Sequence, residues 1–134
     1  IKKRFMFAGK RPTNLGVKAG QLAPCPNTPN CVSSQSEDPE HAIAPLAYAA
    51  IADIKKVVEA MERTTIIEET ENYLYAEFKS RLMGCLDDAA LHKDDINQVV
   101  HVRSASRLGK SDLGVNRKRV EAIRQNLQAL LDNQ

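Results

Sequence analysis

The sequence predicts an α+β fold, a two-layer sandwich in which a four-stranded antiparallel meander carries two helices on one face. Two segments have apolar residues at helical spacing, and four segments between them have the composition or the alternation of strands. The expected order is therefore α-β-β-β-β-α. These elements fill residues 46–134, the expected core domain, and residues 1–45 are expected to form an extended, mostly irregular N-terminal segment.

The first helix is expected over residues 49–63, where apolar residues recur at spacings of three and four: Ile51, Ile54, Val58 and Met61. The last helix is expected over residues 116–132, with Asn116 as its N-cap. Its apolar stripe consists of Val120, Ile123, Leu127, Leu130 and Leu131.

Strands are expected over residues 64–69, 73–80, 82–91 and 99–105. The first contains the β-branched run TTII, and the second alternates cleanly, which is typical of a strand with one buried and one solvated face. The third is weaker, because Asp87 and Asp88 interrupt it, and a charged turn over residues 93–97 separates it from the fourth.

All six prolines lie in the N-terminal segment and exclude a long helix there: Pro12, Pro24, Pro26, Pro29, Pro39 and, at its end, Pro45. So long an irregular stretch either wraps over the domain or reaches a partner. Within residues 1–11, apolar Phe5, Met6 and Phe7 lie beside basic residues, a pattern that fits peripheral contact with a membrane, a partner's groove, or packing on the domain itself.

Composition narrows the classes of function. Aromatic residues make up only 4 % of the chain and Trp is absent, which counts against a stacking platform for nucleic acid. The net charge is only +2, but the charges are unevenly distributed: residues 1–18 contain six basic residues and no acid, the middle of the chain is acidic, and its end is basic. No apolar run is long enough to span a bilayer. Because the chain opens at Ile1, we expect that an upstream targeting or anchor segment was removed.

A loop rich in arginine, serine and glycine, RSASRLGKSDLGVNRKR, covers residues 103–119 between the last strand and the last helix. Its end matches the phosphate-binding pattern of nucleotide-binding proteins, but Ser104 stands where that pattern needs glycine, so nucleotide binding is not expected. Two readings remain. The loop either braces the strand against the helix, or binds an anion or a partner through Arg103, Arg107, Lys110, Asn116 and Arg117.

No catalytic, cofactor or metal set emerges from the spacing. Asp87 and Asp88 are adjacent on a strand and point to opposite faces, so we expect structural ion pairs with Arg103 or Arg119 instead of two-carboxylate catalysis. A metal site that adds Glu77 and His101 has no spacing signature. No Ser-His-Asp or Cys-His set can be assembled from the sequence.

The cysteines leave an alternative open. Cys25 and Cys31, in CPNTPNC, either close a small disulfide loop, which implies an oxidising compartment, or remain thiols in a reducing one. Cys85 is expected to be a buried apolar residue.

Two blocks of the chain, CPNTPNCVSSQ (25–35) and RSASRLGKSDLGVNRKRV (103–120), resemble the domain-of-unknown-function family fourteen-ninety-nine (DUF1499) of bacteria and photosynthetic eukaryotes, and the resemblance extends over about residues 9–125. It implies a secreted, lipid-anchored or membrane-tethered protein, located in the bacterial periplasm or in the plastid or thylakoid. The family's segment FVDDVEF corresponds to residues 85–91, where this chain has Cys85 for the aromatic and Ala90 for the acid. The missing acid argues further against carboxylate chemistry.

We therefore expect a non-catalytic accessory or binding domain that associates with a membrane or a larger complex, photosynthetic complexes among them, through the N-terminal segment and the basic loop. The alternative is a small-anion or phosphorylated-metabolite binding protein, or an enzyme, that uses the 103–119 loop. Nucleic acid is not expected as a partner.

Overall fold

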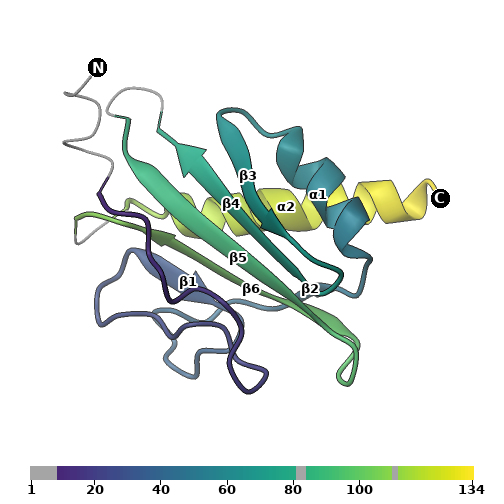
Figure 1. The fold of residues 1–134 in the computed structure, drawn as a ribbon, viewed down its shortest axis with the longest axis horizontal. Coiled ribbons are helices and arrows are strands. Elements are labelled where there is room, and N and C mark those ends of the chain that lie inside the picture. The colour runs from purple at the N-terminus through teal and green to yellow at the C-terminus, as the bar shows by residue number, and fades with distance from the viewer. Residues whose placement is uncertain (1–8, 81–83, 110–111) are drawn as a thin grey trace.

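The computed structural model describes residues 9–80, 84–109 and 112–134, which fold as two helices against an antiparallel sheet (Figure 1). The α+β class is therefore confirmed. In chain order the elements are β1 (Cys31–Ser33), β2 (Leu46–Ala47), α1 (Ile51–Glu59), β3 (Thr64–Glu69), β4 (Tyr73–Lys79), β5 (Leu86–Asp94), β6 (Val99–Ser106) and α2 (Val115–Asp132).

The sheet has six strands, not the four expected, because two short strands precede the first helix. The strands are ordered β1-β6-β5-β4-β3, and β2 also pairs with β6. Both short strands pair antiparallel with β6, β1 with residues 103–105 and β2 with residues 99–100. They thus cover the edge that β6 would otherwise expose to pairing with another chain.

One face of the sheet forms the main core with both helices (Figure 1). Helix α1 contributes Ile54 and Val58, and α2 contributes Val120, Ile123 and Leu127. Each fully buried aliphatic side chain of this size stabilises the fold by about 1.5–3 kcal/mol. The strand residues of this core are Val32, Leu46, Leu74, Ala76, Phe78, Ala89, Leu91, Val100 and Val102.

Each helix has a boundary that differs from the one expected from the sequence. Helix α1 ends at Glu59 instead of residue 63, and Arg63 adopts a left-handed φ of 54° that a helix cannot contain. Helix α2 begins after Gly114, whose φ is 79°, so Asn116 is not its N-cap but a buried residue of the first turn. No helix in the described part of the chain is long and apolar enough to cross a membrane.

The opposite face of the sheet is buried as well, so the prediction of a half-solvated strand over residues 73–80 is wrong. Every residue of β4 except Lys79 is buried. Leu15 and Leu22 of the N-terminal segment pack against Tyr73 and Tyr75 of β4, and the Tyr73 hydroxyl donates a hydrogen bond to the Leu15 carbonyl at 3.0 Å. Figure 1 shows the segment lying across this face.

Strand β5 runs without interruption through Asp87 and Asp88, contrary to expectation. Asp87 lies opposite Phe78 and Asp88 opposite Glu77 in the register with β4. The strand ends at Asp94 and the turn follows over residues 95–98. Part of the predicted strand, residues 82 and 83, lies outside the described residues.

Candidate functional site

The structure separates the five residues predicted for an anion or partner site. Arg103 and Arg107 lie on the face covered by the N-terminal segment, whereas Asn116 is buried on the helix side. Arg117 is exposed and donates to the carbonyl oxygens of residues 42 and 40 at 3.0 and 3.3 Å. Lys110 lies outside the described residues. The described members therefore do not converge on one ligand.

Arg107 is the centre of a buried charge cluster. Its side chain is 5 % exposed and binds Asp88 side-on, Nε to Oδ2 and Nη2 to Oδ1, both at 2.9 Å. Nη2 also donates a hydrogen bond to Glu77 Oε2, and the same oxygen accepts a hydrogen bond from Arg11 Nε at 2.6 Å. The Tyr75 hydroxyl donates to Asp88 Oδ1 at 2.5 Å. The buried guanidinium of Arg107 and the half-exposed guanidinium of Arg11 thus neutralise two buried carboxylates.

The pKa values follow from these contacts. The hydrogen bond to Asp88 raises the pKa of Arg107. Burial alone would raise the pKa of Glu77, but hydrogen bonds from Arg11 and Arg107 outweigh it and lower that pKa. Burial, together with the bond to Asp88, raises the pKa of Tyr75. Arg107 and Glu77 are therefore charged at neutral pH, and Tyr75 is a neutral donor.

Arg103 is the one buried charge of the loop that lacks an ion-pair partner among the described residues. Its Nη2 donates to the Pro24 carbonyl at 3.3 Å, and its Nε is buried without a hydrogen bond. Burial lowers its pKa, and the nearby Asp88 opposes that effect. Directly across the sheet from Arg103 lies Ala90, the position where the resembling family has an acid.

On the helix side, a second set of polar groups joins β6 to α2. Arg119 binds Asp87 at 2.8 Å and lies over the Phe78 ring, 4.6 Å from its centroid. Asn116 accepts from Ser104 at 2.7 Å and donates to Asp112 at 2.7 Å. The two adjacent carboxylates therefore serve opposite faces of the sheet, Asp87 toward α2 and Asp88 toward Arg107. Arg103 pairs with neither.

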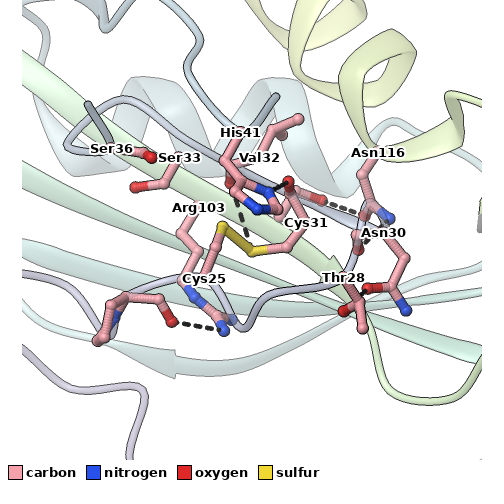
Figure 2. The surroundings of a disulfide bond; sticks show 12 residues. Cys25, Thr28, Asn30, Cys31, Val32, Ser33, Ser36, His41, Arg103 and Asn116 are labelled. Atoms are coloured by element: carbon pink, nitrogen blue, oxygen red, sulfur yellow. Dashed lines mark hydrogen bonds between the residues drawn. A yellow bond between two sulfur atoms is a disulfide. The ribbon is translucent and has the colours of Figure 1, made fainter. Parts of the chain in front are cut away.

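Cys25 and Cys31 form a disulfide, which resolves the alternative that the sequence left open. Cys31 lies in β1 opposite Ala105, so the bond ties the loop of residues 25–30 to the sheet edge. Figure 2 shows Arg103 and His41 beside it. Cys85 is free and only partly buried, not fully buried as expected.

A cavity of about 660 Å³ lies beside the β5–β6 turn, and it contains an arrangement that the sequence analysis missed. Ser34 Oγ lies 3.2 Å from His101 Nδ1, and His101 Nε2 lies 3.1 Å from Asp94 Oδ2. Asp94 and His101 flank one hairpin turn and are near in sequence, but only tertiary pairing of β1 with β6 brings Ser34 to them.

These three side chains are hydrogen-bonded in the order of a Ser-His-Asp proton relay. The two outer members, Ser34 and Asp94, also accept hydrogen bonds from backbone N–H groups. Ser34 Oγ accepts the Val102 N–H at 2.9 Å, and Asp94 accepts the N–H groups of Ile96 and Asn97 at 3.1 and 3.0 Å. Bonds from Asn97, above all from its side chain, hold the pKa of Asp94 at about 2. The geometry is that of a brace linking β1, β6 and the turn.

Comparison with known proteins identifies a family but no individual relative. A family model described as a protein of unknown function (DUF1499) matches residues 21–127, which contain the disulfide, the relay and the charge cluster except Arg11. No curated protein and no solved structure matches the chain.

Proposed function

The chain belongs to the DUF1499 family of proteins of unknown function, and we propose that it is a non-catalytic binding domain that docks on a protein of a larger, membrane-associated complex. The observation that carries the proposal is the placement of its exposed apolar residues.

Three of the four large hydrophobic residues that are exposed in the described structure lie in the β6–α2 connection or at the first residue of α2. These are Leu108, Leu113 and Val115, which are 48 %, 87 % and 43 % exposed, and we call them the β6–α2 patch. The fourth, Ile96, lies at the β5–β6 turn. Apolar side chains gathered at one end of a soluble domain mark an interaction surface.

The described N-terminus begins beside this patch. A Cβ added to Gly9 would lie 3.0 Å from Arg107 Cβ and 3.2 Å from Leu108 Cγ, so the two segments are in contact. Figure 1 shows both at the same end of the molecule. Exposed Lys10 and Lys118 give this end a basic rim. Such a surface suits a partner with an apolar centre and an acidic border.

The neutralised charges support a binding role over the alternative of a small-anion site or enzyme in the 103–119 loop. Arg107 and Arg119 already bind carboxylates, and Arg117 binds backbone carbonyls. An anion would have to displace these contacts. The disulfide supports location in an oxidising compartment, which for our proposal is the bacterial periplasm or the plastid or thylakoid. Membrane contact through residues 1–11 stays a prediction, because residues 1–8 lie outside the described part.

Co-purification from solubilised membranes of the source cells tests the proposal. We expect Leu108→Asp and Val115→Asp to lose the co-purified protein, because a charge in the centre of an interface must be desolvated. The control is Ile96→Asp, which places the same charge on an apolar residue of the β5–β6 turn that is even more exposed, at 92 %. Circular dichroism should show that all three variants are folded.

The proposal is wrong if Leu108→Asp and Val115→Asp retain the partner as well as the unmodified chain, or if Ile96→Asp loses it equally. Direct binding to protein-free anionic vesicles, lost in the same variants, would assign the surface to lipid instead. Truncation should stop at residue 8, since deletion beyond it removes Arg11 and then Leu15 from the fold.

A further inference from the structure

We propose that the loop between β1 and β2 binds a divalent transition-metal ion such as Zn²⁺ through Asp38, Glu40 and His41. One ligand atom of each side chain lies within 4.8 Å of the ligand atoms of the other two. A nitrogen and two carboxylate oxygens are a donor set that Zn²⁺ and its neighbours in the first transition series accept. The site is independent of the β6–α2 patch.

His41 is the feature that separates this loop from an ordinary group of exposed acids. Its side chain is only 5 % exposed, and its Nδ1 lies 2.9 Å from the Cys31 carbonyl oxygen (Figure 2). That oxygen can only accept, so Nδ1 carries a proton, and in the neutral ring Nε2 presents a lone pair. Among the described residues Nε2 makes no hydrogen bond, and Asp38 Oδ2 lies 3.8 Å from it.

This is the arrangement of a metal-binding histidine. Such a residue donates its second ring N–H to a carbonyl or carboxylate, which sets the tautomer and aims the other nitrogen at the metal. Burial holds the His41 ring in place, and the peptide oxygen of Cys31 is held in turn by the β1–β6 pairing and the disulfide. The nitrogen therefore needs little reorganisation to bind an ion.

The two carboxylates are positioned but not neutralised. Asp38 Oδ1 accepts the Glu40 N–H at 3.0 Å, which leaves Oδ2 facing His41. In the described structure neither acid forms an ion pair with a lysine or an arginine. Arg117 reaches the loop, yet it donates to the carbonyl oxygens of Glu40 and Ala42 instead of a carboxylate.

The loop is also ordered and accessible. The Asp38 carbonyl accepts the N–H groups of His41 and Ala42 at 2.9 and 2.8 Å, and the Ser33 N–H donates to the His41 carbonyl at 2.8 Å. A cavity of about 230 Å³ borders Asp38 and His41. It has room for the water molecules that would complete the coordination of an ion held by three protein ligands.

Calorimetric titration of the metal-free, disulfide-intact chain with Zn²⁺, repeated with Mn²⁺ and Co²⁺, tests the site. We expect one site per chain, with affinity lowered about tenfold or more in Asp38→Asn and Glu40→Gln. Both residues are exposed, so these variants should fold. Glu37→Gln is the matched control, because it removes an equal charge from the adjacent exposed position. His41→Gln should abolish binding, and its fold is checked by circular dichroism.

Absence of binding by all three ions, or an equal loss of affinity in Glu37→Gln, would overturn the proposal. A visible absorption spectrum of the Co²⁺ form that is unchanged in His41→Gln would also overturn it, since the buried nitrogen would then not be a ligand. Saturating Zn²⁺ should in addition raise the melting temperature, since only the folded loop assembles the three ligands.

Discussion

Replacement of Arg107 by methionine tests whether the basic loop uses its charge inside the molecule. Methionine keeps an unbranched apolar stem and removes the guanidinium. The variant leaves Asp88 with the Tyr75 hydroxyl as its remaining side-chain donor, and Glu77 with Arg11.

The magnitude follows from burial. The Asp88 side chain is 2 % exposed and receives both of its charged hydrogen bonds from Arg107. Removing one partner of a buried ion pair costs about 3–5 kcal/mol, because a charge is left uncompensated. Domains of this size are stable by about 5–15 kcal/mol, so the variant should lose a large share of its stability.

Urea unfolding followed by circular dichroism measures this loss. Asp88→Asn should be destabilising by itself, and the double variant should lose less than the sum of the single losses by about 1–3 kcal/mol. Arg117→Met is the matched control in the same loop. Because Arg117 is exposed and binds only backbone carbonyls, its loss should stay within about 0.5 kcal/mol.

An internal role for the Arg107 charge is excluded if the free energy of unfolding of Arg107→Met lies within about 0.5 kcal/mol of that of the unmodified chain. It is also excluded if phosphate or a phosphorylated metabolite stabilises the unmodified chain and not the variant, since the guanidinium would then bind that ligand.

Four further predictions concern other parts of the structure. The pKa of Glu77 is lowered in the folded state, so the ionised carboxylate stabilises the fold above the unfolded pKa of 4.5, and this stabilisation is lost as the pH falls through the folded pKa. In acid unfolding, the difference in free energy of unfolding between the unmodified chain and Glu77→Gln should therefore shrink below pH 4.5. Cys25→Ser should cost about 2 kcal/mol in urea unfolding, the amount for a disulfide closing a short loop, and an unchanged midpoint would contradict this. Ser34→Ala should lower the free energy of unfolding by about 1–3 kcal/mol, because it leaves the His101 ring and the Val102 N–H without their hydrogen-bond partner. A fluorophosphonate probe should not label Ser34 in mass spectrometry; labelling would show that Ser34 is a nucleophile instead of part of a brace. Ala90→Glu should leave stability unchanged or raise it by chemical denaturation, because the new carboxylate faces Arg103; a loss of several kcal/mol would show that Arg103 cannot serve as its partner.

The sequence alone determined the elements whose physics is local. The apolar stripes placed both helices, because a period of 3.6 residues puts such side chains on one face whatever the rest of the chain does. Alternation placed β4 and β6, and adjacency put Asp87 and Asp88 on opposite faces of β5. The two sequence blocks indicated the family, which the match over residues 21–127 confirms.

Only the tertiary structure decided which distant groups meet. That Leu15 and Leu22 bury the second face of β4, that Arg107 and not Arg103 binds Asp88, and that Ser34 reaches His101 all depend on how segments dozens of residues apart are paired. Cys25 bonds Cys31 because the loop turns back onto the sheet edge. Such contacts follow from the register and packing of the whole sheet, which no local pattern of side chains encodes.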